Sequence, residues 1–296
     1  MHEREAEGRA FRSDPTRGEQ SVSASLRPRG DGVLTSYVVG IINHRTYEDL
    51  ERCLGSVKLQ TQAPEAVLVV DADADPALHE DAARRHPEVH WRAVPNRGFG
   101  AGGNEILRWA WREVGEVGHV LILNPDIELQ PDFAAELLGE MQRHARVALA
   151  SGKLLRPDGR TLDSAGIVLP RHRRPRDRGS EERDRGQYEQ PEFVFAVTGA
   201  ALMVRLEAAE DLAVEGEVFD EDFFLYHEDT DLSWRANLLG WRVLYAPAAR
   251  AIHGRRWRRA GRFRIPPWVR RHSFKNYYLS MLKNERGGDF VRNLPV

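Results

Sequence analysis

Short apolar runs alternate with segments of helical periodicity between Tyr37 and Ser151, and this alternation constrains the fold more than any other feature of the sequence. Residues 37–42 and 66–71 are β-rich apolar runs, and the residues between them, 46–60, carry apolar side chains at helical spacing. Two strands joined by a helix pair in parallel, because the helix returns the chain to the edge where the first strand began. We therefore predict an α/β fold built on a doubly wound, mostly parallel sheet.

The same rhythm continues through the first half of the chain. Further strands are predicted at 89–94, 119–123 and 147–151, and further helices at 75–86, 103–114 and 131–144. After Ser151 the elements become shorter: two strands meeting at Thr198 and Gly199, a loop leading into a helix within 219–241, and a strand over 242–253. This second part predicts a smaller mixed subdomain beside the parallel sheet.

The composition narrows the class of protein. No window of the 296 residues approaches the roughly 18 uninterrupted apolar residues of a spanning helix, so an integral membrane protein is not expected. The single cysteine, Cys53, excludes an internal disulfide framework and a multi-cysteine metal site. Met1 is followed by charged residues without an apolar signal region, so we expect a cytoplasmic protein.

Three segments differ from the rest in composition. Residues 1–34 mix Ser, Gly, Pro and both charges without apolar periodicity and predict a disordered leader, whereas the mixed charges of 171–187 predict a mobile surface loop. From Arg250 onward the chain has 13 Lys and Arg against 2 Asp and Glu, a net charge of +11, and the preceding residues carry −13. The basic segment 256–296 contains Trp, Phe and Tyr and predicts an amphipathic helix after Pro267.

Polar residues follow the carboxyl ends of the first four predicted strands. The sequences at these positions are INHRTYE, DADAD, NRGFGAGGN and NPDIE, which contain several carboxylates and a glycine-rich loop. In open α/β sheets ligands bind beyond the carboxyl ends of the strands. We therefore expect these residues to line a binding site at one edge of the sheet.

The glycine-rich sequence GFGAGG can be interpreted in two ways. Gly98, Gly100 and Gly103 match the G-x-G-x-x-G spacing of dinucleotide-binding sites, and Asp126 lies near the offset of an acidic ribose ligand. That fingerprint belongs in the first strand-to-helix turn of its unit, whereas this one follows the third strand. The alternative is that the glycines permit a close backbone approach and the start of a helix.

The end of the fourth strand carries Asn124, Asp126 and Glu128. Oxygen ligands suit a divalent cation such as Mg²⁺ or Mn²⁺, which often binds through one or two carboxylates and the phosphates of a substrate. The alternative is a turn that merely ends the strand. His253, at the end of a later strand, is a candidate second ligand for the same ion.

The densest acidic cluster lies within residues 219–234 and is interrupted by bulky apolar residues, so some of its carboxylates must enter a partly buried environment. Burial raises the pKa of a carboxyl group and suits it to act as a general base. Glu228 and Asp229 are the candidates. The alternative is that these acids begin a helix, where negative charge favours the helix dipole.

Together these motifs resemble the inverting glycosyltransferases of family 2, which have the GT-A fold, and in particular a bacterial rhamnosyltransferase-like branch. The resemblance extends from about Tyr37 to Lys283. It is carried by IINHRTYEDLERCLGSV, VLVVDADADP, NRGFGAGGN, LILNPD, TGAALMVR, FDEDFFLYHEDTDLSWRANLLGWRVLY and AIH. It implies a nucleotide-sugar-binding half at 35–150 and an acceptor-binding and catalytic half at 151–255.

On the donor side the resemblance implies that Asp71 contacts the nucleotide base. Asn124 replaces the first acid of the family's D-x-D motif, so Asp126 would hold Mg²⁺ or Mn²⁺ against the donor diphosphate, with His253 as a second ligand. Other residues expected on the nucleotide-sugar side are Asn43, Asp73, Asn96, Gly98, Gly100, Asn104 and Asn124.

On the acceptor side the resemblance implies that Asp229, with Glu228 beside it, removes the proton from an acceptor hydroxyl. Thr198 and Gly199 would border the acceptor pocket. The hydroxyl oxygen would then attack the anomeric carbon in line, with inversion of configuration.

The expected function is transfer of a sugar, with rhamnose favoured by the branch, from a dTDP- or UDP-linked donor to a glycan or lipid-linked acceptor in cell-envelope polysaccharide synthesis. Two alternatives stand beside it: a non-catalytic nucleotide-sugar or glycan-binding module on the same fold, and an NAD-dependent oxidoreductase. The basic residues of 256–284 are expected to contact the inner face of the cell membrane, unless they belong to an ordinary packing helix. The acidic balance of the rest disfavours nucleic acid as a partner.

Overall fold

The computed structural model describes residues 35–255 and 265–289. The predicted leader at 1–34 lies outside the described residues, and so do 256–264 and 290–296 of the predicted basic segment.

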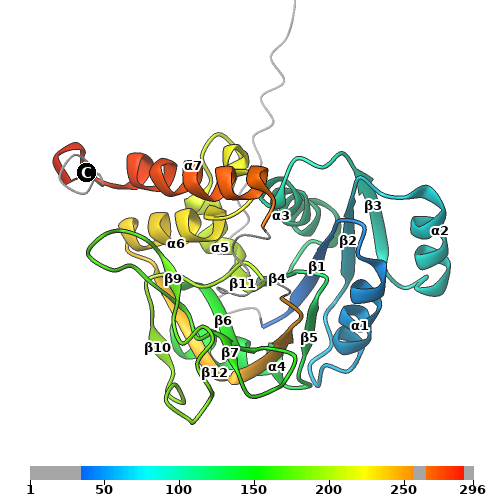
Figure 1. The fold of residues 1–296 in the computed structure, drawn as a ribbon. Helices are drawn as coiled ribbons and strands as arrows, with labels where there is room; N and C mark the ends of the chain where they lie inside the picture. The colour runs from blue at the N-terminus through cyan, green and yellow to red at the C-terminus, as the bar shows by residue number, and fades with distance from the viewer. Residues whose placement is uncertain (1–34, 256–264, 290–296) are drawn as a thin grey trace, which may run out of the picture. The chain divides into compact units, whose positions relative to one another are not determined.

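A parallel four-stranded unit forms one half of the main sheet (Figure 1). β1 (Tyr37–Asn43) pairs in parallel with β2 (Val67–Ala72) on one side and with β4 (His119–Leu123) on the other. β3 (His90–Val94) pairs in parallel with β2 at the edge. The predicted strand, helix, strand alternation is therefore confirmed for this half.

The other half of the sheet is mixed. β11 (Ala201–Arg205) lies between β4 and β6 (Val147–Leu155) and is antiparallel to both, and β12 (Arg242–His253) is parallel to β6. Within the described residues the order of the path is β10-β12-β6-β11-β4-β1-β2-β3. The remaining strands are β5 (Ile127–Leu129), β7 (Leu162–Ser164), β8 (Ile167–Val168), β9 (Arg176–Asp177) and β10 (Glu192–Phe193).

Helices cover both faces of the sheet (Figure 1). Their bounds are α1 (Tyr47–Lys58), α2 (Pro76–Arg85), α3 (Phe99–Trp109), α4 (Phe133–Arg143), α5 (Leu206–Leu212), α6 (Glu228–Leu238) and α7 (Pro267–Asn284). Successive side chains of a strand point to opposite faces, so Val39 and Ile41 of β1 join the core beneath α1 and α4, whereas Val38 joins the core beneath α3, α5 and α6. The doubly wound α/β class is confirmed.

Some predicted boundaries are wrong. The helix expected from Gly103 begins at Phe99, so most of the glycine-rich sequence lies in the first turns of α3 rather than in a loop, and α3 continues into a π-helical turn, η1 (Ala110–Val114). The two strands expected to meet at Thr198 and Gly199 are instead β10 and β11, separated by residues 194–200. Long-range pairing decides these ends, since β11 begins where Ala201 meets Leu123 of β4.

The segment 171–187, predicted as a mobile loop, contains β9 and is tied to neighbouring elements. Arg178 Nε donates to the carbonyl of Ala165 at 2.8 Å, and β9 pairs with β8. The division of the chain into halves at 35–150 and 151–255 stays a prediction.

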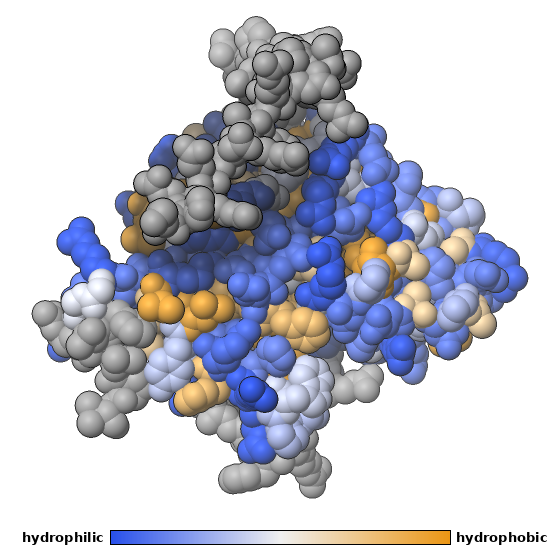
Figure 2. All heavy atoms as spheres, turned by 90° about the horizontal axis from the view of Figure 1, so that it is seen from above, coloured by the Kyte–Doolittle hydropathy of each residue, from blue (hydrophilic) through white to orange (hydrophobic). Residues whose placement is uncertain are grey.

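Helix α7 confirms the helix expected after Pro267, but its apolar side chains do not form one stripe. Its buried side chains include Asn276, Ser280 and Asn284, while Trp268 and Phe274 are exposed. Figure 2 views the side of the molecule on which α7 lies in Figure 1, and apolar side chains are scattered there among hydrophilic ones. Among the described residues, no helix is long and apolar enough to cross a membrane.

Candidate active site

The carboxyl ends of β1, β2, β4 and β12 share one edge of the sheet, because these strands run in the same direction. The antiparallel strand β11 starts at this edge, which brings Thr198 and Gly199 there, and the amide of Asn124 donates to the carbonyl of Ala200 at 2.9 Å. β5 is antiparallel to β12, with Ile127 opposite His253. The topology thus gathers Asn124, Asp126, His253, Thr198 and Gly199, as the sequence predicts.

The buried side chain of Asp71, at the end of β2, makes several hydrogen bonds. Its carboxylate accepts from Asn43 Nδ2 at 2.9 Å and from Tyr47 Oη at 2.7 Å, and it lies 2.7 Å from His79 Nδ1. Asn43 also accepts at Oδ1 from Thr46 Oγ1 at 2.9 Å. Asp71 and Asn43 therefore hold β1, α1 and α2 together, and their contact with a nucleotide stays a prediction.

A second chain of hydrogen bonds links the loops after β2 and β3. Asp73, which is exposed with a positive φ of 49°, accepts at Oδ1 from the Asn96 amide at 3.0 Å. Asn96 Oδ1 in turn accepts from the Gly98 amide at 3.0 Å. Both side chains shape the rim beside α3, and their contact with a nucleotide stays a prediction.

The glycines of GFGAGG permit a close approach of the segment that precedes α6. A Cβ on Gly98, whose φ is +92°, would lie 2.1 Å from the Phe224 carbonyl oxygen, and one on Gly103 would lie 2.8 Å from the Phe219 ring. A Cβ on Gly100 would lie 3.2 Å from the Asp220 carbonyl oxygen, which is a tight contact. The structural interpretation of these glycines is therefore confirmed.

The start of α3 is also covered by this segment, because the Phe99 amide donates to the Phe224 carbonyl at 2.8 Å. A dinucleotide fingerprint instead leaves the first helical amides free for a pyrophosphate. A cavity of about 100 Å³ beside Gly98, lined by Ile42, Val70 and Val94 among others, is small for a dinucleotide. These features disfavour the oxidoreductase alternative.

Asn104 is committed to contacts within the chain. Its Oδ1 accepts from the amides of Val218 and Phe219 at 3.0 and 2.9 Å, and its Nδ2 donates to the Phe219 carbonyl at 2.8 Å. The residue is buried inside α3. Asn104 therefore holds the chain before α6 against α3, and its contact with the donor stays a prediction.

Asp126 and His253 form a compact pair at the binding edge. His253 Nε2 lies 3.5 Å from Asp126 Oδ1, and the Gly254 amide donates to the Asp126 carbonyl at 2.7 Å. On the other side of the imidazole, His253 Nδ1 lies 2.7 Å from Asp163 Oδ2. An imidazole held at one nitrogen by a buried carboxylate presents its other nitrogen in a fixed direction, which is the usual arrangement around a metal-binding histidine.

Asp126 and His253 each shift the pKa of the other. Burial would lower the pKa of His253, but its hydrogen bonds to Asp126 and Asp163 raise that pKa to about 9. Burial would raise the pKa of Asp126, and the hydrogen bond and charge of His253 outweigh it and lower that pKa. Without a bound cation the pair is therefore ionic at neutral pH.

The donor set fits a divalent cation that takes few protein ligands. In the described part of the chain no group of three or more His, Cys, Asp or Glu could hold a metal ion. Asp126 and His253 offer one oxygen and one nitrogen at the binding edge, and Mg²⁺-type ions commonly use one or two protein ligands with waters and phosphates. Asp163 faces the other imidazole nitrogen and belongs to the support of the pair.

Sequence reasoning missed the residues that support this pair. Asp163 on β7 is buried and also meets Arg156 Nε at 2.7 Å and Arg255 Nη1 at 3.4 Å. Arg255 continues to Asp177 on β9 at 3.0 Å. Charged residues in a charged chain give no sequence signal of this kind, because the contacts with His253 and Arg255 span 78 to 92 positions.

Asp229 is held at the same edge by backbone donors. Its Oδ2 accepts from the Gly199 amide at 2.9 Å, and its Oδ1 accepts from the Thr230 amide at 2.6 Å. Burial raises the pKa of Asp229 above its usual value, although these two amides oppose the rise. The structure thus brings Asp229 to Gly199 and Thr198, as the sequence predicts.

Glu228 precedes Asp229 but lies in a different environment. It is the first residue of α6, is buried, and its Oε2 has no hydrogen-bond partner among the described residues. Burial, and to a lesser extent the charge of Asp229, raises the pKa of Glu228 to about 8. Two adjacent acids in different environments can take different protonation states, and at neutral pH Glu228 is the neutral one.

The raised pKa of Glu228 predicts a pH-dependent loss of stability. Between its ordinary pKa and about 8 the unfolded chain releases this proton while the folded chain keeps it, so the free energy of unfolding falls as pH rises through that range. Glu228→Gln removes this contribution. The difference in urea midpoint, Glu228→Gln minus the unmodified protein, is therefore expected to be larger at pH 8.5 than at pH 5.

Metal-free urea titrations at the two pH values measure this difference. The control is Glu80→Gln, which changes an exposed carboxylate. Its urea midpoint should differ from that of the unmodified protein by the same amount at both pH values. Equal pH dependence for Glu228→Gln and the unmodified protein would contradict an elevated pKa.

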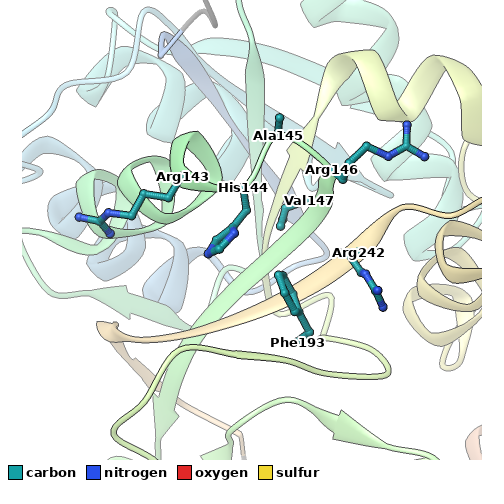
Figure 3. A pocket seen from close by; sticks show the side chains of 7 residues that line it. All are labelled: Arg143, His144, Ala145, Arg146, Val147, Phe193 and Arg242. Atoms are coloured by element: carbon teal, nitrogen blue, oxygen red, sulfur yellow. The ribbon is translucent and has the colours of Figure 1, made fainter.

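A separate depression of about 360 Å³ lies at the opposite edge of the sheet (Figure 3). It is lined where β6 begins at Val147 and β12 begins at Arg242, which is the amino edge of these strands. Figure 3 shows the side chain of Arg143 extending away from those of Arg146 and Arg242, so the guanidinium groups do not converge on one ligand. The candidate active site is therefore at the carboxyl edge.

Comparison with solved structures identifies the fold. A crystal structure of GalNAc-T7 with UDP, GalNAc and Mn²⁺ superposes with a TM-score of 0.63 at 14% identity, covering 83% of this chain. This chain covers 48% of that protein. The fold is that of the GT-A glycosyltransferases.

Comparison of sequences gives the family. The profile described as "Glycosyl transferase family group 2" matches residues 119–273. An N-acetylglucosaminyl-diphospho-decaprenol L-rhamnosyltransferase of Mycobacterium tuberculosis is 31% identical over 231 residues, which are 69% of this chain and 71% of that protein. The O-antigen biosynthesis protein RfbC of Myxococcus xanthus is 29% identical over 81% of this chain, which corresponds to 18% of RfbC. The chain belongs to glycosyltransferase family 2, and within it the chain is similar to an L-rhamnosyltransferase.

Proposed function

We propose that this glycosyltransferase is inverting and metal-dependent, and that Asp229 is its catalytic base. The observation that carries the proposal is the position of Asp229, whose carboxylate is held by the Gly199 amide at the edge that also carries Asp126 and His253. A base fixed by backbone donors keeps one orientation toward an incoming hydroxyl. Its raised pKa improves it as a proton acceptor.

The proposed reaction is a single displacement. The Asp229 carboxylate accepts the proton of the acceptor hydroxyl while the hydroxyl oxygen forms a bond to the anomeric carbon. The bond from that carbon to the diphosphate oxygen breaks, and its electron pair leaves with the nucleoside diphosphate. Attack from the side opposite the leaving group inverts the configuration.

Asp126 and His253 are the residues that would hold Mg²⁺ or Mn²⁺. When bound, such an ion supplies positive charge against the negative charge of the diphosphate. The role of this chain is to present Asp126 and the Nε2 atom of His253 together, and Asp163 secures the orientation of the imidazole from the other side. Cation binding requires that His253 lose the proton it shares with Asp126.

For the substrates we propose L-rhamnose on dTDP or UDP as the donor and a lipid-linked glycan as the acceptor. The support is the mycobacterial relative, whose name specifies L-rhamnose and an N-acetylglucosaminyl-diphospho-decaprenol. The non-catalytic alternative is disfavoured, because a binding module does not require a half-buried base with a raised pKa at the edge that carries a cation-binding pair.

Two experiments test this proposal. Melting temperatures of the full chain with UDP, dTDP, GDP or NAD, each with and without Mn²⁺, identify the nucleotide, because a ligand of the native state raises the melting temperature. Incubation with dTDP-L-rhamnose and an N-acetylglucosaminyl-diphospho-lipid should then give a glycosylated lipid whose new bond has the anomeric configuration opposite to the donor. A shift with NAD alone, or retained configuration, would overturn the proposal.

We further propose that the outer side of α7 contacts an anionic membrane surface where lipid-linked acceptors reside. Trp268, Phe274 and Leu282 are 55%, 66% and 63% exposed, and Arg270 and Arg271 lie exposed beside them. Residues 256–284 contain nine Lys or Arg and no Asp or Glu. Exposed aromatic and basic side chains together favour the interface of an anionic bilayer.

Replacing Arg270 and Arg271 with Gln is expected to weaken binding to phosphatidylglycerol-containing vesicles about 30-fold, since each basic residue near such a surface contributes about 1 kcal/mol. Vesicle co-sedimentation measures the binding. The matched control replaces two exposed arginines outside α7, Arg84 and Arg112, with Gln. An equal loss in the control, or no binding by the unmodified protein, would show that α7 is only a packing helix.

A further inference from the structure

Helix α7 is attached to the rest of the molecule mainly through polar side chains. Asn284 Nδ2 donates to Asp231 Oδ1 of α6 at 2.8 Å, and Lys275 Nζ donates to the Asp222 carbonyl at 2.6 Å. Lys283 pairs with Asp220 and Asp231. These contacts all fall on the chain between residues 220 and 231, which contains the start of α6 and the candidate base.

Asn276 of α7 contacts three backbone carbonyls of this part of the chain through one nitrogen atom. Its Nδ2 lies 2.6 Å from the carbonyl oxygen of Phe223 and 2.8 Å from those of Leu225 and Tyr226. The side chain is completely buried. Three carbonyl oxygens around one amide nitrogen identify Asn276 as a hydrogen-bond donor to this turn of backbone.

The segment that Asn276 holds has a strained backbone. Phe224, Tyr226 and His227 have φ values of +61°, +69° and +72°, although none of them is glycine. Such a backbone conformation is strained for a residue other than glycine and persists only where its surroundings enforce it. The buried amide of Asn276 is part of that enforcement.

This strained segment connects both sides of the active site. It leads directly into Glu228 and Asp229, the latter bound to the Gly199 amide. In the other direction its Phe224 carbonyl accepts from the Phe99 amide at the start of α3. A shift of the segment would therefore move the base relative to the donor side.

We propose that Asn276 is a positioning residue for catalysis, which fixes the strained turn 223–227 and thereby the place of Asp229. The proposal rests on the proposed role of Asp229 as the base. The Asn276 amide binds backbone carbonyls and not the carboxylate of Asp229, so it acts through the backbone that it holds. Small displacements of a catalytic group reduce rate more than they reduce substrate binding.

Asn276→Leu tests this role, because it keeps the approximate shape of the side chain and removes the donor. At a temperature well below its melting transition, kcat is expected to fall by about 10–100-fold while KM for the donor stays within about threefold. The matched control is Asn284→Leu, a buried asparagine on the same helix whose amide binds the Asp231 side chain rather than the turn. It should change kcat by no more than about threefold.

Hydrogen exchange makes the test independent of turnover. Amides of residues 223–229 should exchange faster in Asn276→Leu and not in Asn284→Leu. If Asn276→Leu does not fold, Asn276→Ser, which is smaller and cannot reach all three carbonyls, should show the same loss of kcat and the same faster exchange. Unchanged kcat and exchange, or equal losses in the Asn284 control, would overturn the proposal. If the unmodified protein transfers no sugar, the proposed function fails, while exchange still decides whether Asn276 holds the turn.

Discussion

Replacing Asp229 with Asn is expected to lower the rate of sugar transfer by about 10²–10⁴-fold, the usual contribution of a general base, with little change in donor binding. The amide keeps the size of the carboxylate and can still accept from the Gly199 amide through its oxygen. It cannot take the proton of an acceptor hydroxyl. Glu228, which has a pKa of about 8 and a buried carboxyl oxygen without a hydrogen-bond partner among the described residues, does not replace it at neutral pH.

Steady-state transfer assays and calorimetric titration with the nucleoside diphosphate measure the two quantities for Asp229→Asn. The control is Asp222→Asn, which changes an exposed acid in the same acidic cluster and should leave both unchanged. Turnover within about tenfold of the unmodified protein would remove Asp229 from the role of base, since even the weakest general base contributes more.

Replacing Asp126 with Asn is expected to weaken Mn²⁺ binding by more than about 100-fold and to lower Mn²⁺-supported transfer at least as far. Residues that merely orient a metal ligand already contribute about 10–100-fold, so loss of the carboxylate beside His253 Nε2 should exceed that range. The variant also removes the negative charge that raises the pKa of His253. A lower pKa of His253 favours the neutral imidazole that binds a metal ion, but this does not replace the missing oxygen ligand.

Glu128→Gln is the matched control for Asp126→Asn. Glu128 lies on β5 two positions after Asp126, is exposed, and pairs with Arg52 Nε at 3.1 Å. Titration of Mn²⁺ in the absence of nucleotide, followed by the same titration with it, should distinguish the two variants. Equal Mn²⁺ affinity in Asp126→Asn and Glu128→Gln would exclude Asp126 as a ligand.

The parallel half of the sheet could be predicted from sequence because a strand that is buried on both faces needs a continuous run of apolar residues, and such a run is visible in the local sequence. Val38, Val39 and Ile41 are all apolar, as a strand covered on both faces requires, and helical spacing follows each such run. The order of polar residues after the strands also predicted which edge binds ligand. Asp126 follows β4 and His253 ends β12, and these two residues meet because the two strands run in the same direction and end at a common edge. The antiparallel strand β11 begins at that edge, which brings there Gly199 and the Asp229 carboxylate that its amide binds.

The roles of other predicted residues depended on distant partners. Gly98 and Asn104 match a ligand-binding pattern in sequence, yet their space and hydrogen bonds are filled by Phe224 and Phe219, more than a hundred positions away. Asp71 likewise meets Tyr47 and His79 rather than open space. Local spacing cannot distinguish a glycine beside a ligand from a glycine beside another part of the chain.

The sequence by itself determined the fold class, the binding edge and the acids that gather there, because each follows from short-range periodicity and from the direction of parallel strands. Only the tertiary structure decided that Asp163 orients His253 and that Asn276 holds the turn before Asp229, across 90 and about 50 positions. Such contacts join a polar side chain to another polar side chain or to backbone carbonyls, and groups of these types are common everywhere in the chain. Their partners are chosen by the packing of β7 against β6 and of α7 against α6, which no local pattern encodes.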